Sequence, residues 1–342
     1  MDKNTLIGAL LIGAVLIGFT WFSKPDPTQS PAPSPQDTTQ LVTQAPAPVA
    51  GASSTDSASL DSLGAPVLPP YLQPAQEHIV ELKNEKLSVK LSTKGGAPVE
   101  AVLADYLDQS KKPVHLFRKG DARLDLPLRT LENRLVSTAD ANFSVVESTD
   151  STAVLRMQID DVAYLDYAYK LRPADYRVDL VIRGHELRRF LPVNIALQDI
   201  QWTQRIPQQE QSWKFEGQYS GVYYHFPQGD VDRLETTSES SEDVQETLRW
   251  VAFKDKYFSS VLIASATGFK DNKLSIKAAK EGSGYVRDCS FKGTFPISIK
   301  ETETVLPFTF FFGPNDYDLL RGYDAGVSKE EALHLDHLVY LG

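Results

Sequence analysis

Cysteine is nearly absent from this sequence, because Cys289 is the only one among 342 residues. A single thiol excludes an intramolecular disulfide. A lipoprotein signal is excluded as well, since it would need a cysteine directly after the N-terminal apolar run. The lack of disulfides does not indicate a cytosolic protein, because a domain of this size can be stabilised by burial of its core alone.

Positive charge is also scarce. The formal net charge is −10, and residues 25–76 contain neither lysine nor arginine. The first 24 residues carry Asp2, Lys3 and Lys24, a net charge of +1, so the rest of the chain carries −11. An acidic chain is a poor partner for nucleic acid and lacks a broad basic face for anionic lipid. We therefore expect no nucleic acid among its partners.

Only one long apolar run is present, Leu6–Phe22, and it contains no charged residue. As a helix its 17 residues would span roughly 26 Å, close to the hydrocarbon thickness of a bilayer. Trp21 and Phe22 stand at its end, where aromatic rings favour a membrane interface. Because no small-x-small cleavage site follows, we predict an uncleaved transmembrane anchor over residues 1–24, with a cleaved signal peptide as the alternative.

The segment after the anchor is rich in proline. Residues 25–76 hold eleven of the 21 prolines, and Tyr71 is their only aromatic residue. This composition buries too little apolar surface to offset the entropy of ordering, so we predict a disordered linker over residues 25–76. Since basic segments tend to stay in the cytoplasm, a linker without them favours a cytoplasmic N-terminus and a folded domain on the outer side.

From about residue 77 the sequence changes to short runs in which apolar and polar residues alternate, which is typical of β-strands. His78–Leu82 and the alternating Leu87, Val89 and Leu91 predict a hairpin, and Gly95-Gly96 predicts a turn. Further strands are expected at Val99–Leu103, Phe143–Val146, Ala153–Ile159, Tyr164–Leu171, Tyr176–Ile182, Val193–Leu197, Gly221–Phe226, Ser259–Ala264, Lys273–Ala278, Phe295–Ile299 and Thr304–Phe312. This pattern predicts a mainly β domain over residues 77–325, folded as one large antiparallel sandwich. The segment Trp250–Phe258 fits either a short helical turn or a strand end.

A short amphipathic helix is predicted over residues 326–342. Ser328-Lys329-Glu330-Glu331 matches a capping box, and Leu335, Leu338 and Val339 follow with helical spacing. Such a helix could lie on a membrane surface or pack on the sandwich.

Motifs for chemistry are few. The sequence has no P-loop and no G-x-S-x-G motif. His185-Glu186 begins like a zinc-protease helix, but Arg189 stands where the second histidine is needed. His334 and His337 could share a metal, although exposed helical histidines are the more common explanation. The acidic stretch 229–246 lacks calcium-loop spacing and is expected to be a solvated loop. We therefore predict no catalytic, cofactor-binding or metal-binding residues and no cofactor.

Two weaker features keep a sugar-related function open. The aromatic residues between Trp202 and Phe226 could line a groove for a peptide or a sugar, although core and edge positions explain them better. An epimerase would need a histidine and a carboxylate flanking the sugar carbon, and His225 near Asp230 is the only local candidate.

Several segments, in their order along the chain, resemble the YidC family of bacterial membrane protein insertases. They are Met1–Leu6 with the glycine-containing run after it, Leu87–Gly96 with its Thr-basic-Gly-Gly turn, Trp250-Val251-Ala252 with Tyr257-Phe258, Phe312-Gly313-Pro314 and Leu335-Asp336-His337-Leu338. The resemblance implies an inner-membrane protein with a cytoplasmic N-terminus and a periplasmic β-supersandwich related in shape to galactose mutarotases. It also implies contacts with the inner membrane, nascent membrane-protein clients and components of the Sec translocon, and it implies no enzymatic activity.

In that family the insertase core, a group of five helices with a polar groove, follows this domain. The sequence ends at Gly342, where the core would begin, so we expect an N-terminal part of an insertase without the insertion machinery itself. Two alternatives remain open at this stage. One is an anchored periplasmic sugar-binding or epimerase-like protein, and the other is an independent anchored chaperone that uses the aromatic residues as an adhesive groove.

Overall fold

The computed structural model describes residues 68–234, 239–264 and 267–339. The predicted anchor and the linker up to residue 67 lie outside these ranges. Within the described part, no helix is both long and apolar enough to cross a bilayer. The end of the predicted linker is described, and there Pro70–Leu72 form a 3-10 helix (η1) that places Tyr71 in the hydrophobic core.

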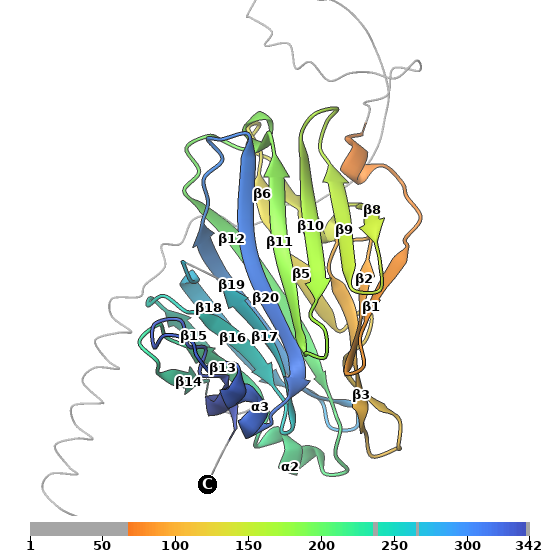
Figure 1. Ribbon diagram of the computed structural model, residues 1–342, viewed down its shortest axis with the longest axis vertical. Coiled ribbons are helices and arrows are strands. Elements are labelled where there is room, and N and C mark those ends of the chain that lie inside the picture. Colours follow the sequence, from red (N-terminus) through yellow and green to blue (C-terminus); the bar gives the residue numbers. More distant parts are fainter. Residues whose placement is uncertain (1–67, 235–238, 265–266, 340–342) are drawn as a thin grey trace, which may run out of the picture. The chain divides into compact units, whose positions relative to one another are not determined.

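The described chain is built almost entirely from antiparallel strands (Figure 1). The first half contributes β1 (Ile79–Lys83), β2 (Leu87–Ser92), β3 (Pro98–Leu107), β4 (Pro113–Phe117), β5 (Ala122–Asp125), β6 (Pro127–Arg129), β7 (Leu135–Ser137), β8 (Ser144–Ser148), β9 (Thr152–Gln158), β10 (Tyr164–Leu171) and β11 (Arg177–His185). The second half contributes β12 (Leu197–Pro207), β13 (Gly221–His225), β14 (Val231–Arg233), β15 (Glu239–Val244), β16 (Trp250–Lys254), β17 (Phe258–Ala264), β18 (Lys270–Ala278), β19 (Tyr285–Pro296) and β20 (Glu303–Pro314).

The largest sheet has nine strands in the order β14-β13-β16-β17-β20-β11-β10-β9-β8. In β11 every second residue is buried, from Val178 to Gly184, so one face of the sheet meets the core and the other meets solvent. The central strand β20 pairs with β17 on one side and with β11 on the other, and Figure 1 shows it as the long strand between them.

The second layer consists of a five-stranded sheet, β15-β18-β19-β12-β5, and a four-stranded sheet, β1-β2-β3-β4. Aromatic rings join this layer to the nine-stranded sheet. Trp202 of β12 stacks on Phe253 of β16 with ring centroids 3.9 Å apart, and Phe117 of β4 meets Phe312 of β20 at 5.3 Å. The core therefore lies between the layers, as a β-sandwich requires. β6 and β7 form a separate two-stranded ribbon.

The predicted hairpin and glycine turn are confirmed. β1 pairs with β2 in register, and Asn84 closes the turn by accepting hydrogen bonds from the backbone N–H groups of residues 86 and 87. Gly95 and Gly96 have φ of +85° and +67°, values that favour glycine. A Cβ on Gly96 would lie 2.8 Å from the Phe143 ring, so close packing also requires glycine there.

Some strand predictions were wrong. Residues 193–197 form a turn up to the start of β12, because the chain must reverse before that strand. Of the strand expected at Phe295–Ile299, only the first two residues belong to β19, which begins ten residues earlier at Tyr285. The acidic stretch expected as a loop contains the edge strands β14 and β15. Of the two alternatives for Trp250–Phe258, the strand is the correct one, because residues 250–254 form the fully buried strand β16.

The C-terminal amphipathic helix is not formed in the described residues. Ser328 and Glu331 do hydrogen-bond in a turn, but the chain then extends, and His334 adopts a left-handed backbone with φ of 50°. Only Leu335–Leu338 are helical, as a short 3-10 helix (η4). Leu335 and Leu338 are 0% and 1% exposed, so the apolar residues pack into the sandwich. The remaining short helices are α2 (Trp213–Gly217), α3 (Tyr317–Gly322), η2 (Thr138–Asp140) and η3 (Leu187–Arg189).

Candidate functional site

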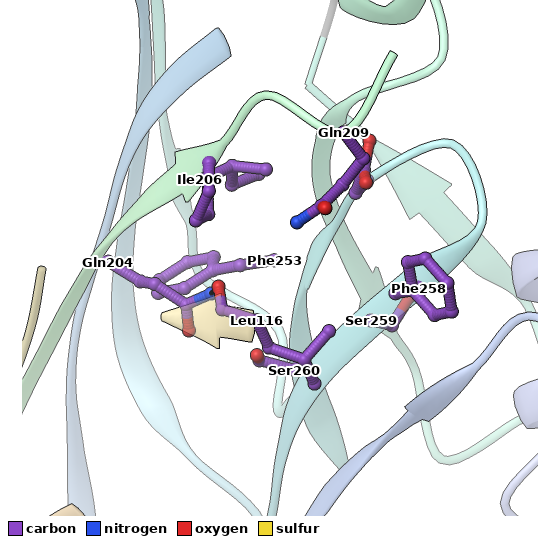
Figure 2. A pocket seen from close by; sticks show the side chains of 10 residues that line it. Leu116, Gln204, Ile206, Gln209, Phe253, Phe258, Ser259 and Ser260 are labelled. Carbon is purple, nitrogen blue, oxygen red and sulfur yellow. Dashed lines mark hydrogen bonds between the residues drawn. The ribbon is translucent and has the colours of Figure 1, made fainter. Parts of the chain in front are cut away.

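A small cavity lies inside the sandwich between β12, β16 and β17 (Figure 2). Its volume is about 10 Å³, and polar side chains of Gln204, Gln209 and Ser260 face it between the apolar ones. Gln204 Oε1 and Ser260 Oγ are buried there without a hydrogen-bond partner in the described structure. A space of this size suits at most one water molecule, whereas sugar and cofactor pockets measure several hundred Å³.

Two carboxyl groups are buried beside this cavity. Glu216 of α2 accepts hydrogen bonds from the backbone N–H groups of Gln209 and Glu210 at 2.9 and 3.0 Å. Asp255, which follows β16, accepts one from the Ser220 hydroxyl at 3.3 Å. Burial raises the pKa of Asp255 well above its usual value, and the neighbouring Glu216 carboxyl raises it further. The adjacent Lys254 is also buried, which lowers its pKa to about 8. These groups hold α2 against the sheet, and Asp255 also lines the small cavity.

The aromatic residues between Trp202 and Phe226 occupy core and edge positions, as the sequence favoured. Trp202 and Tyr224 are buried in the core. Phe215 is exposed, and together with Tyr219 and Tyr257 it surrounds the Lys256 ammonium at 4.3 to 5.7 Å from the ring centroids. This arrangement is a cation–π cluster on the rim rather than an aromatic groove.

The solvent face of the nine-stranded sheet carries a shallow hollow of about 490 Å³ across β9, β10, β11 and β20. Val181 and Pro307 form apolar floor positions, and Arg172 pairs with Asp179 at 2.7 Å on the margin. An open surface that mixes apolar and charged groups is typical of protein contacts, whereas small-molecule sites are enclosed.

A group of histidines gathers where the C-terminal segment meets β13, at the lower end of the sandwich in Figure 1. His225 ends β13 and stacks on Trp250 of β16, with ring centroids 5.4 Å apart and planes 8° from parallel. The Trp250 indole N–H donates to the Leu333 carbonyl, and the Asp324 carboxylate accepts from the N–H groups of residues 333 and 334. These bonds place the His334 ring 5.6 Å from the His225 ring.

Buried ring nitrogens without partners distinguish this group. His225 is 1% exposed, and neither of its ring nitrogens has a hydrogen-bond partner in the described structure. The pKa of His225 is lowered to about 4, chiefly by burial and to a smaller extent by the neighbouring His334 and Arg249. The η4 turn brings ligand atoms of His334, Asp336 and His337 within 4.8 Å of one another.

The other residues considered in the sequence behave differently. Asp230 is exposed at the turn after β13 and makes no bond to His225, so the acid–base pair of an epimerase is not formed. His185 hydrogen-bonds to Glu303, and Arg189 pairs with Asp160 at 3.1 Å. The zinc-protease motif rejected in the sequence is therefore an ion-paired turn in η3.

Comparison with known sequences decides the family. The sequence model of the YidC periplasmic domain matches residues 79–342. The chain belongs to the YidC family. The Membrane protein insertase YidC of Porphyromonas gingivalis is 44% identical over 353 residues, which cover 100% of this chain and 56% of that protein. The protein of the same name in Parabacteroides distasonis is 34% identical, again over 100% of this chain and 56% of its own length. The chain thus spans little more than half the length of these YidC relatives.

Solved structures give a weaker likeness. A galactose mutarotase related enzyme from Lactobacillus acidophilus shares 8% identity, covers 69% of this chain and 97% of its own, and has a TM-score of 0.43. A putative aldose 1-epimerase from Escherichia coli shares 9% identity, covers 69% and 99%, and also has a TM-score of 0.43. Similarity at this level does not establish a shared activity for this YidC family member.

Sequence reasoning noted His334 and His337 but missed their neighbours. On the predicted helix Asp336 shares their polar side, but nothing in the sequence marks it as a ligand, and His225 is more than a hundred residues away in the chain. The one available signal was the unusual density of histidine and aspartate at residues 334–337.

Proposed function

We propose that this chain is the membrane-anchored periplasmic part of a membrane protein insertase, which assists the insertion and folding of inner-membrane proteins. The proposal rests on a match that covers the whole of this chain, at 44% identity, to part of a protein named as a membrane protein insertase. Because the chain corresponds to only 56% of that relative, its role here is that of one part of a larger machine.

The proposed placement has the N-terminus in the cytoplasm and residues 77–325 in the periplasm. An apolar run at residues 6–22, followed by a segment without lysine or arginine, supports this orientation. The proposed partners are nascent membrane-protein clients and components of the Sec translocon. The hollow across β9, β10, β11 and β20 is an accessible surface for such contacts.

The geometry favours a rigid support over a loose tether. Leu335 and Leu338 are buried in the sandwich, and Asp324 and Trp250 hold the backbone of residues 333 and 334. Residue 338 is therefore held firmly against the sheets.

A sugar-converting function receives no comparable support. His225 lacks a carboxylate partner in the described structure, and the cavity between β12, β16 and β17 has a volume of only about 10 Å³. The proposal thus keeps the sandwich as a scaffold.

Depletion of the protein in its host tests the function. A short membrane-protein client should remain accessible to protease on the cytoplasmic side after depletion, and the wild-type gene should restore its insertion. Normal insertion during depletion would contradict the proposal.

A labelling experiment tests the orientation separately. Cys289 is buried, which raises its thiol pKa, so the native chain should react little with maleimides. Ser283→Cys places a thiol in the exposed turn between β18 and β19. We expect a membrane-impermeant maleimide to label this variant once the outer membrane is permeable. Labelling only after the inner membrane is opened would refute a periplasmic domain.

A further inference from the structure

Four side chains of residue types that commonly ligate metals lie near one another at the C-terminal segment. His225 comes from β13, and His334, Asp336 and His337 come from η4 and the residue before it. His334 directly precedes η4 with a left-handed backbone, and its ring centroid lies 5.4 Å from that of His337. The ligand atoms of His334, Asp336 and His337 all lie within 4.8 Å of one another.

The ring separations fit a common ligand. Two imidazoles bound tetrahedrally to one Zn²⁺ through bonds of about 2.0 Å would have ring centroids about 5.2 Å apart. The observed separations are 5.4 Å between His334 and His337 and 5.6 Å between His225 and His334. The ring separations are thus close to those of a shared ion, and the side chains must still turn so that their ring nitrogens face it.

Buried nitrogens without partners point in the same direction. Both ring nitrogens of His225 and the Nε2 atom of His334 are buried and have no hydrogen-bond partner in the described structure. Leaving buried polar atoms unbonded costs free energy, so such groups call for an explanation. Gly229 leaves room beside them, because a Cβ there would lie 3.5 Å from His334 Nε2.

The surrounding charges allow a cation. Asp336 belongs to the set, and the Asp324 carboxylate binds the backbone N–H of His334. Arg249 opposes a cation, since its backbone N–H bonds to the His225 carbonyl and its charge acts on the His225 ring. Two carboxylates against one guanidinium leave a net negative charge around the histidines.

We propose that His334, Asp336 and His337 bind one Zn²⁺ ion and that His225 supplies the fourth ligand. Imidazole nitrogen with one carboxylate oxygen is a ligand set that suits zinc, whereas Mg²⁺ and Ca²⁺ prefer oxygen alone. The ion would join η4 to β13 and so fasten the C-terminal segment to the nine-stranded sheet. This site is independent of the proposed insertase function.

Zinc binding to the full chain, purified in detergent without a histidine tag, tests the proposal. Titration calorimetry with ZnCl₂ should show one equivalent bound per chain, and the thermal unfolding temperature should rise with zinc but not with MgCl₂. The variants His337→Gln and Asp336→Asn change exposed or half-buried side chains and should fold normally. Each is expected to weaken zinc binding by about 10-fold or more.

His78→Gln is the matched control, because His78 is an exposed histidine next to β1, far from residues 225 and 334–337 in the sequence. It should bind zinc as the wild type does. His225→Gln tests the fourth ligand, and circular dichroism shows whether that variant remains folded. Failure of the wild type to bind one equivalent, or wild-type affinity in both His337→Gln and Asp336→Asn, would overturn the site. Wild-type affinity in a folded His225→Gln would remove His225 from the ligand set.

Discussion

The buried pair Glu216 and Asp255 makes a specific prediction about stability and pH. Asp255 is 5% exposed, and burial together with the Glu216 carboxyl raises its pKa well above the usual 3.8. Asp255 is therefore protonated in the folded protein at pH values where it is ionised in the unfolded chain. Asp255→Asn keeps a neutral side chain of the same shape, with an N–H₂ group that can donate to Glu216 and a carbonyl that can accept from Ser220.

The sign and size of the effect follow from proton linkage. Between pH 3.8 and the folded-state pKa, the folded wild type binds one proton more than the unfolded chain at Asp255. The contribution of Asp255 to the free energy of unfolding therefore falls by about 1.4 kcal/mol for each unit of pH increase in this range. Asparagine does not titrate, so the variant lacks this fall. Relative to wild type, Asp255→Asn should therefore gain stability as the pH rises above 3.8, and the gain should stop growing at the folded-state pKa of Asp255.

Urea unfolding of both proteins, followed by tryptophan fluorescence at several values of pH, measures this difference. The pH at which the difference stops growing gives the folded-state pKa of Asp255. Asp161→Asn, at an exposed turn, is the matched control and should show a constant difference. If Asp255→Asn also shows a constant difference from pH 5 to pH 7, the carboxyl pair is not protonated as argued.

Three further predictions concern the turn, the C-terminal segment and Lys254. In Gly96→Ala the new Cβ would sit on a backbone with positive φ and 2.8 Å from the Phe143 ring. We expect the free energy of unfolding in urea to fall by about 1–3 kcal/mol, and wild-type stability would contradict this backbone geometry. Leu335→Ala removes a fully buried side chain and should cost about 2–5 kcal/mol, whereas Leu135→Ala, at a 64% exposed position, should change unfolding by less than about 0.5 kcal/mol. Burial lowers the folded-state pKa of Lys254 to about 8, below its unfolded value of 10.5. Wild-type stability should therefore rise as the pH increases from about 8 to 10.5. Lys254→Met should abolish that rise, and an unchanged pH profile of the variant would show that Lys254 titrates normally.

Much of the fold could be predicted because single strands carry a local signal. The alternation at Tyr164–Leu171 coincides with β10, and its burial follows the sandwich pattern. β19 was mostly missed although it lies between two strands, because Arg287, Asp288 and Lys292 interrupt its apolar residues. Arg287 is buried there and donates to the Gly217 carbonyl. A tertiary partner outside the strand thus overrode the local polarity.

The C-terminal segment and the histidine group could not be predicted in the same way. The Ser328 hydroxyl donates to the Glu331 carboxylate instead of accepting from a backbone N–H, and the positions of Leu335 and Leu338 in the core decide the backbone path. His225 reaches His334 only because Trp250 holds Leu333 from another strand. Contacts between segments this far apart in the sequence leave no periodic pattern from which they could be deduced.

The position of β20 has a consequence for how this domain is made. β11 ends at His185, yet its neighbour in the large sheet is not synthesised until residues 303–314. While the chain is emerging, β11 is an open edge with unpaired backbone groups, a form that is prone to aggregation and slow to fold. The large sheet closes only when residues 303–314 have been synthesised, so the first half of the domain must stay unpaired at this edge until nearly the end of translation.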